Sequence, residues 1–322
     1  MSDLPLSHRL QLALAAKEAT CLLCSLVLLL AVGMASVHAQ DPGTLNPEPL
    51  PPLPIPTSPM TPAKELFARK TMPLPGPPRS IGSYADGCLA GAVALPISGP
   101  AWRVMRVSRH RYWGNSSLVA FIERLADKAK NVGWNGLLIG DMSQPRGGPM
   151  LTGHSSHQIG LDVDIWFTPM PDHDLSREEI EFDTALNMVA TDRRDVDPKV
   201  WTGERTALVR TAAQDPVVTR IFVNAAIKKA MCRDAGLDHA WLSKVRPWWG
   251  HDEHFHVRIA CPSDSSQCKP QPPVSSGDGC GHELDSWFTA SMVQPPAPSA
   301  KPKHNFTLAA MPKECRTVVN AP

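Results

Sequence analysis

Two segments of the chain carry side chains able to bind a metal and move protons. The segment HSSHQIGLDVDIW (154–166) contains His157 and, seven residues later, Asp164, and the segment HDEHFHVRIAC (251–261) contains an HxH pair ending at His256. A catalytic zinc site uses three imidazole or carboxylate ligands and leaves one position open for water. These three residues supply such a set and predict a hydrolytic zinc centre, whereas a polar loop that runs into a strand is the alternative.

Both segments are predicted to contain strands, because apolar and polar residues alternate along them. Successive side chains of a strand point to opposite faces of the sheet. One face is apolar, with Leu161, Val163, Ile165, Phe255, Val257 and Ile259, and the other carries Asp162, Asp164, Trp166, His254, His256 and Arg258. If the two strands are neighbours, His256 and Asp164 converge on one point.

The other polar residues of these segments suggest acid–base and supporting roles. His254 lies one side-chain repeat from His256, which suits a general base that takes a proton from water and passes it to the departing amine. His251 is a candidate donor to the oxyanion, and His154 is expected to line the cleft or to orient a ligand. Asp162 is either the partner of a ligand histidine or a carboxylate at the rim.

Three further residues near the second segment each have two interpretations. Trp248 and Trp249 either form a wall of the substrate cleft or belong to the core. Arg258 either pairs with a substrate carboxylate or forms an internal salt bridge.

Composition and periodicity indicate the class of fold. The 322 residues include 32 basic and 31 acidic side chains, for a net charge of +1 without a basic stripe, so no nucleic-acid partner is expected. Two helices are predicted, over 115–134 with a serine cap and over 215–236 with an aspartate cap, and a weaker one over 176–190. We expect an α+β fold in which a small, mainly antiparallel sheet carries the zinc site, flanked by helices and long disulfide-pinned loops.

Residues 1–39 have the features of an export signal. Lys17 precedes the apolar run 21–35, and SVHAQ offers a small-residue cleavage site after Ala39. The run is short for a membrane span, so a removed signal is favoured over an uncleaved anchor, and no stable membrane insertion is expected after its removal. The mature chain would then start near Gln40, outside the cytoplasm.

The rest of the chain divides into a proline-rich arm, residues 40–79, without predicted regular structure, and a packed domain, residues 80–322. Beyond the signal, six cysteines remain: Cys88, Cys232, Cys261, Cys268, Cys280 and Cys315. An even number in an oxidising compartment predicts three disulfides, with 15 possible pairings. Free thiols or a thiolate metal site are the alternative, although the chain beyond the signal has no CxxC pair.

Longer strings around the two motifs carry a resemblance to a known family. GGPMLTGHSSHQIGLDVDIW and RPWWGHDEHFHVRIACP resemble the metal motifs of the penicillin-insensitive murein endopeptidases. These enzymes belong to a zinc peptidase group that also includes lysostaphin-type and D-alanyl-D-alanine peptidases and the hedgehog signalling domain. The resemblance spans residues 80–319 and includes SIGSYADGCLAGAVALP, CPSDSSQC and GDGCGHELDSWF. These flanking strings are specific to the endopeptidases, whereas the two short motifs are shared by the whole group.

The resemblance implies roles for particular residues. It makes His157, Asp164 and His256 the ligands of Zn²⁺ and His254 the catalytic base, and it places His154 and His251 at further active-site positions. It also implies the disulfides Cys88–Cys315, Cys232–Cys280 and Cys261–Cys268.

The implied substrate is the peptide cross-link of cell-wall peptidoglycan (murein), cut between D-alanine and meso-diaminopimelate in the periplasm of a Gram-negative cell. Two other functions remain open. One is a D,D-carboxypeptidase or dipeptidase of the same group, and the other is a zinc-bearing, non-catalytic murein-binding module.

Overall fold

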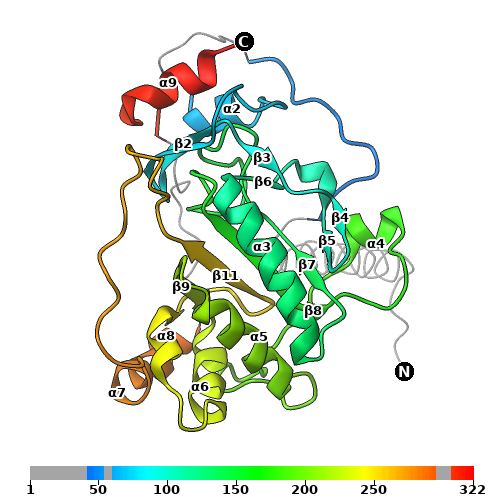
Figure 1. Cartoon of the computed structure of the whole chain (residues 1–322), viewed down its shortest axis with the longest axis vertical. Helices are drawn as coiled ribbons and strands as arrows, with labels where there is room; N and C mark the ends of the chain where they lie inside the picture. The colour runs from blue at the N-terminus through cyan, green and yellow to red at the C-terminus, as the bar shows by residue number, and fades with distance from the viewer. Residues whose placement is uncertain (1–41, 54–59, 295–305) are drawn as a thin grey trace, which may run out of the picture. The chain divides into compact units, whose positions relative to one another are not determined.

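A seven-stranded sheet forms the centre of the computed structural model, which describes residues 42–53, 60–294 and 306–322 (Figure 1). The strand order is β10-β9-β11-β8-β7-β5-β4. Their bounds are β4 Ser98–Gly99, β5 Trp102–Val104, β7 Leu137–Ile139, β8 Asp162–Pro169, β9 Val218–Val223, β10 Val245–Pro247 and β11 His254–Ile259. Strands β10 and β9 pair in parallel, as do β5 and β7, and the other neighbours are antiparallel. The expected α+β class with a mainly antiparallel sheet is confirmed.

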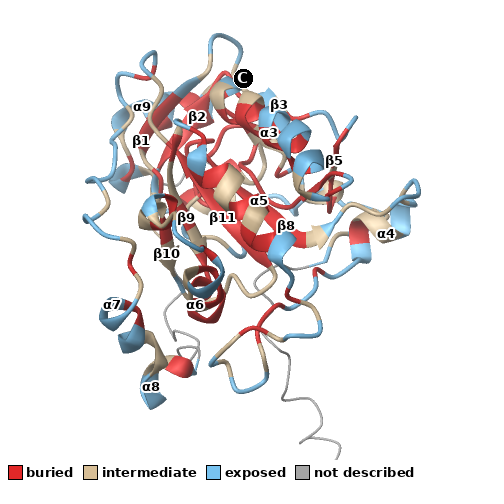
Figure 2. Ribbon diagram, turned by 60° about the horizontal axis from the view of Figure 1, so that its bottom comes forward, coloured by how far each residue is buried: buried red, intermediate tan, exposed pale blue. Residues whose placement is uncertain are grey.

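Strands β8 and β11 are neighbours, and their register confirms the predicted convergence. The antiparallel pairing sets His256 opposite Asp164 and Phe255 opposite Ile165. All six apolar residues of the predicted face are buried in the main hydrophobic core. Figure 2 shows β11 and most of β8 coloured as buried, so each contributes one face to the core and turns the other to a buried polar cluster.

Helices α3 (Ser116–Ala129), α5 (Gly203–Gln214) and α6 (Ala225–Asp234) supply the helical side of this core. Helix α3 matches the predicted helix over 115–134, but its cap is Asn115, whose side chain accepts from the backbone N–H of Ser117. Helix α5 was not predicted, because its buried positions include small and polar residues such as Thr206 and Ala213, which weaken the apolar pattern.

The helix predicted over 215–236 is wrong in its first half. Residues 218–223 form strand β9, and only Ala225–Asp234 is helical, with Asn224 as the cap that accepts from Ala226 N–H. The sequence VTRIFV is rich in β-branched and aromatic residues, which favour an extended chain. Asn224 then starts the helix, and Gly236, with φ of +68°, follows its end.

A second hydrophobic cluster joins the beginning and the end of the domain. It is formed by the hairpin β1 (Arg79–Ser83) and β2 (Asp86–Ala90) with helices α2 (Ala63–Phe67) and α9 (Lys313–Asn320). Helix α2 lies in the proline-rich arm, where no regular structure was predicted, and Phe67 is fully buried. Figure 1 shows α2, β2 and α9 close together.

All three disulfides implied by the resemblance are present: Cys88–Cys315, Cys232–Cys280 and Cys261–Cys268. The first crosses the second cluster from β2 to α9, and the third closes a short loop directly after β11.

The remaining strands and α-helices are short. They are β3 Val93–Ala94, β6 Trp113–Gly114, α4 Arg177–Phe182, α7 His282–Asp285 and α8 Ala290–Val293. Helix α4 starts with a capping box between Ser176 and Glu179 and covers only part of the helix predicted over 176–190.

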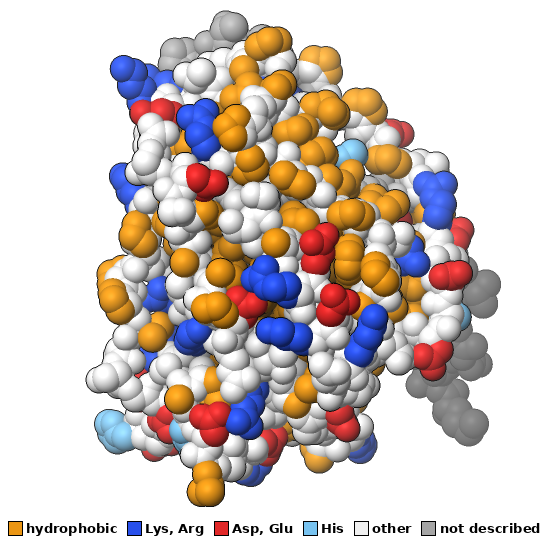
Figure 3. Space-filling view, viewed as in Figure 1, with side chains coloured by type: hydrophobic (Ala, Val, Ile, Leu, Met, Phe, Trp, Pro, Cys, Tyr) orange, Lys and Arg blue, Asp and Glu red, His pale blue; other side chains and the backbone are white. Residues whose placement is uncertain are grey.

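The predicted export signal, residues 1–39, lies outside the described residues. Among the described helices, none combines the length and the apolar character that a bilayer span requires. On the face shown in Figure 3, acidic and basic side chains are interspersed, in line with the near-neutral net charge.

We expect Phe67→Ala to lower the free energy of unfolding by about 3–5 kcal/mol, because it removes a fully buried ring from the second cluster. Urea unfolding followed by circular dichroism would measure the change. As the control, Met72→Ala, whose side chain is 64% exposed, should stay within about 0.5 kcal/mol of the parent. A Phe67→Ala loss as small as that of the control would contradict the packing of α2.

Candidate metal centre

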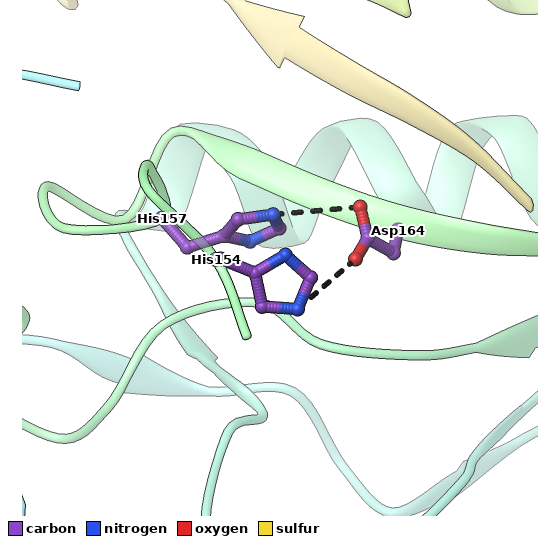
Figure 4. A group of neighbouring side chains, drawn as sticks. All are labelled: His154, His157 and Asp164. Atoms are coloured by element: carbon purple, nitrogen blue, oxygen red, sulfur yellow. Dashed lines mark ion pairs between the residues drawn. The ribbon is translucent and has the colours of Figure 1, made fainter. Parts of the chain in front are cut away.

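The candidate site lies where β8 and β11 pair, on the face of these strands opposite the main core. His157 belongs to the loop before β8 and has a φ of +66°, a left-handed conformation that is uncommon for a residue with a side chain. Its backbone N–H donates to Asp162 Oδ2 at 3.1 Å, which holds the loop against the strand. Figure 4 shows His154 and His157 turned toward Asp164 of β8.

The structure brings the three predicted ligands together. His157 Nε2 and His256 Nδ1 are 3.1 Å apart, and Asp164 Oδ1 lies 3.4 Å from the first nitrogen and 3.1 Å from the second. All three side chains are buried. One residue comes from a loop and the other two come from paired strands, so the sheet register fixes most of the cluster.

In each ligand imidazole, the hydrogen bond made by one ring nitrogen fixes the proton there and leaves the lone pair on the other nitrogen. His157 Nδ1 lies 2.8 Å from the carbonyl oxygen of Met142, which can only accept, so the proton is on Nδ1 and the lone pair is on Nε2. His256 Nε2 lies 3.0 Å from Asp162 Oδ1, which places its lone pair on Nδ1. Two lone pairs and the carboxylate of Asp164 therefore face one another in the buried cluster.

This donor set fits a divalent cation. Both carboxylate oxygens of Asp164 are buried, and neither makes a hydrogen bond of good geometry among the described residues, although histidine nitrogens lie 3.1–3.6 Å from them. A buried carboxylate without such hydrogen bonds is costly unless a cation compensates it. Two imidazole nitrogens and one carboxylate oxygen are the ligand types of a catalytic zinc site, and neighbouring divalent metals accept them as well.

Burial and neighbouring charges shift the pKa values of these three groups. Burial lowers the pKa of His157 to about 4, so this imidazole is neutral at neutral pH. Burial also disfavours a charged His256, but the negative charges of Asp162 and Asp164 outweigh it and raise its pKa. Burial would raise the pKa of Asp164, yet the surrounding histidines hold it well below the ordinary value. In the absence of a metal, a proton on His256 can take the place of the cation.

His154 reaches the same cluster from the other side of Asp164. Its Nε2 lies 3.5 Å from Asp164 Oδ2 and 2.8 Å from Asp141 Oδ2. The candidate ligand atoms of His154, His157 and Asp164 are all within 4.8 Å of one another. His154 is thus close enough to be an alternative metal ligand.

His254 and His251 form the remaining wall of the cluster. His254 Nε2 lies 3.6 Å from Asp164 Oδ1, and burial lowers the pKa of His254, which favours a neutral imidazole able to accept a proton. The rings of His251 and His254 are 5.0 Å apart. Burial holds the pKa of His251 well below the ordinary value, and its Nδ1 donates to the carbonyl oxygen of Trp249 at 2.9 Å. Neutral His251 therefore has an acceptor at Nε2, which does not fit the predicted role of oxyanion donor.

Asp162 is an internal partner of the cluster and does not lie at a rim. It is buried, and it accepts hydrogen bonds from His256 Nε2 at 3.0 Å and from Arg258 Nε at 2.7 Å. Burial would raise the pKa of Asp162, but the charge of Arg258 holds it far below the ordinary value. The guanidinium lies 4.2 Å from the ring centre of Tyr84 and 5.1 Å from that of Phe222. Arg258 is thus engaged internally, contrary to a role in pairing with a substrate carboxylate.

Sequence reasoning missed three residues that support His154. Asp141 is buried just after β7, and its Oδ2 pairs with Arg109 Nη2 at 2.8 Å and Arg111 Nη1 at 2.9 Å. The signal in the sequence was a carboxylate at the end of the predicted strand NGLLIGDMS. Its partners could not be assigned, because they lie about 30 residues before it in an irregular segment with few periodic features.

The two tryptophans before the second motif have different environments. Trp248 is 55% exposed, and its ring lies 6.0 Å from that of Phe222, which in turn lies 5.4 Å from the ring of His256. Trp249 instead packs against Trp287, with 5.5 Å between ring centres. Ring contacts through the half-buried Phe222 therefore link the exposed Trp248 to the buried His256.

Comparison with known proteins identifies the family of this chain. Residues 80–320 match the family described as penicillin-insensitive murein endopeptidase. A protein of that name from Klebsiella pneumoniae subsp. pneumoniae is 45% identical over 250 residues, covering 78% of this chain and 89% of the relative. The protein of that name from Haemophilus influenzae is 45% identical over 249 residues, covering 75% and 82%. The one from Escherichia coli O1:K1 / APEC is 45% identical over 250 residues, covering 78% and 89%.

We expect the affinity for Zn²⁺ to rise by about tenfold per pH unit between about pH 5 and pH 6.5. Over this range His157, with a pKa of about 4, is already neutral, whereas His256, with its raised pKa, still holds a proton that the metal must displace. Calorimetric titration of the metal-free protein would measure the slope. In Asp162→Asn, which removes a charge that raises the pKa of His256, the rise should move to lower pH. An affinity that does not change with pH would contradict this account.

Proposed function

Because this chain belongs to the family of penicillin-insensitive murein endopeptidases, we propose that His157, Asp164 and His256 bind a divalent metal, with Zn²⁺ as the ion used. Family membership makes the chain a peptidase of cell-wall murein. The observation that carries the metal assignment is the mutual approach of two imidazole lone pairs and a buried carboxylate that makes no hydrogen bond of good geometry among the described residues.

In this proposal the ligand atoms are His157 Nε2, Asp164 Oδ1 and His256 Nδ1. When bound, the cation would supply Lewis-acid polarisation of the scissile carbonyl and acidify water. Asp162 supports the site, because it accepts hydrogen bonds from His256 Nε2 and from the backbone N–H of His157. A carboxylate partner of this kind fixes the ring orientation and makes the ligand nitrogen more basic.

His254 is the proposed general base. It is buried and neutral beside Asp164, and it lies on the strand face that carries His256. Its Nε2 can take a proton from the attacking water and deliver it to the departing amine.

His154 and His251 complete the proposed active site. His154 Nε2 lies 3.5 Å from Asp164 Oδ2, and the other oxygen, Oδ1, is the one nearest to His157 and His256. His251 adds a neutral acceptor beside His254, suited to an amide N–H of the bound peptide.

The proposed substrate bond is the D-alanyl–meso-diaminopimelyl cross-link of peptidoglycan, cut in the periplasm. The exposed ring of Trp248, which contacts Phe222 beside His256, offers an aromatic contact for a bound cross-linked peptide. We propose no nucleic-acid partner and no membrane insertion once the export signal has been removed.

We expect His157→Ala and His256→Ala to lose both bound metal and activity, because each removes a ligand. His254→Ala should keep the metal and lose about 10²- to 10⁴-fold in kcat, as expected for removal of a general base. Metal content by mass spectrometry and cleavage rates would be measured together. His173→Ala is the matched control, since this histidine is 61% exposed and its described partner is Glu179, away from the histidine cluster. Full metal content in all three site variants would refute the ligand assignment.

A pair of substrates distinguishes the proposed activity from that of a carboxypeptidase. Purified protein would be incubated with cross-linked muropeptide dimers and, separately, with monomeric pentapeptide, each with and without a chelator. We expect chelator-sensitive conversion of dimers to monomers that a β-lactam does not inhibit. If only the pentapeptide loses its terminal D-alanine, the protein is a carboxypeptidase. If neither substrate changes while metal is bound, it is a binding module.

A further inference from the structure

The turn that precedes β11 has an unusual backbone. Gly250 and His251 follow one another with φ of +67° and +60°, so both lie in the left-handed region. Glycine adopts this conformation readily, but a residue with a Cβ does so rarely and persists there only when its surroundings hold it. His251 is only partly buried, whereas His254 and His256 are buried. His251 is therefore the most accessible of these three histidines.

Backbone hydrogen bonds hold the far side of this turn. The N–H of Asn224 donates to the carbonyl oxygen of His251 at 3.1 Å, and the N–H of Met188 donates to that of Asp252 at 2.8 Å. Asn224 is also the cap of α6, where its Oδ1 accepts from the N–H of Ala226 at 2.9 Å. The turn is thus attached to two segments that are distant from each other in the sequence.

The side chain of Asp252 adds a forked ion pair. Arg193 Nη1 lies 2.7 Å from Asp252 Oδ2, and Nη2 lies 3.2 Å from Oδ1. Asn224 Nδ2 donates to the same Oδ1 at 2.7 Å. The side chains of Arg193 and Asp252 are only 20% and 16% exposed, so salt and water screen this pair less than an ion pair on the open surface. Two side chains therefore fix the carboxylate of the residue that directly follows His251.

Arg193 is itself held in place. Its backbone has a φ of +58°, its N–H donates to Ala190 O at 2.8 Å, and its Nε donates to Val293 O at 3.2 Å. Each guanidinium nitrogen thus has an acceptor within the protein. Arg193 and Val293 line one small cavity with Trp248 and Trp249, which precede the turn. The guanidinium therefore serves to hold this part of the chain together.

We propose that Arg193, through Asp252, is a positioning residue for His251. The ion pair holds the turn in its left-handed conformation and thereby keeps the His251 ring beside His254, with 5.0 Å between ring centres. The inference rests on the proposed function, in which His251 accepts an amide N–H of the cross-linked peptide. It is independent of the metal ligands, with which Arg193 makes no described contact.

The test compares Arg193→Met, His251→Ala and the double variant in the metal-loaded protein, with cross-linked muropeptide dimers as the substrate. Methionine keeps much of the apolar stem of arginine but removes the charge and the fork. We expect Arg193→Met to raise KM by about 5- to 20-fold and to change kcat by less than about threefold, because peptide binding is weakened while the reacting groups stay in place. The double variant should have the KM of His251→Ala alone, because both residues act through the same contact.

Two further variants separate positioning from a general loss of stability. Arg193→Lys keeps the charge but loses the fork, so its KM should lie between those of the parent and of Arg193→Met. Arg124→Met is the matched control, since Arg124 pairs with the buried Asp215 at 3.2 Å and makes no described contact with the histidine cluster. Its kcat and KM should equal those of the parent. A loss of kcat at unchanged KM, or effects of Arg193→Met and His251→Ala that simply multiply, would overturn the inference.

A second measurement does not require catalysis. Hydrogen–deuterium exchange followed by mass spectrometry reports on the amides of Met188 and Asn224, which donate to the turn. We expect Arg193→Met to raise the exchange rates of the peptides that contain them by about tenfold or more, and to leave those of α3 unchanged. Unchanged protection of both amides would overturn the inference whether or not the protein is active. The proposed function fails separately, when a chelator leaves dimer cleavage by the parent unchanged.

Discussion

The register between β8 and β11 is the constraint on which the site depends. Pairing of His256 with Asp164 places two proposed ligands side by side, and pairing of Phe255 with Ile165 puts the opposite faces into the core. Because side chains alternate along a strand, a shift by one residue would bury the ligands in the apolar core and expose its aliphatic residues. Core packing therefore enforces the geometry of the chemical site.

Around this pair, acceptors fix the proton on each histidine. The carbonyl oxygen of Met142 directs the lone pair of His157 into the cluster, and Asp162 does the same for His256. Asp141 contacts His154 Nε2 at 2.8 Å. Arg258 balances the charge of Asp162, and Arg109 with Arg111 balances that of Asp141. The carboxylate of Asp164 is surrounded by histidine nitrogens and pairs with no guanidinium among the described residues.

The sequence predicted those parts of the site that follow from strand alternation. The two strands, the two faces and the convergence of Asp164 with His256 needed only local periodicity. The sequence could not predict Asp141 as a partner of His154, because that contact depends on how three distant segments pack. The prediction of a single helix over 215–236 failed for a local reason, since one apolar run contains both strand β9 and helix α6. Helix α2 was missed because five residues amid prolines give almost no periodic signal.

The measurement that tests the central claim most directly is anomalous diffraction at the zinc absorption edge from crystals of the metal-loaded protein. The account predicts one peak at about 2.0–2.2 Å from His157 Nε2, Asp164 Oδ1 and His256 Nδ1. A peak bound by His154 in place of His256, or one located away from the β8–β11 pair, would contradict it.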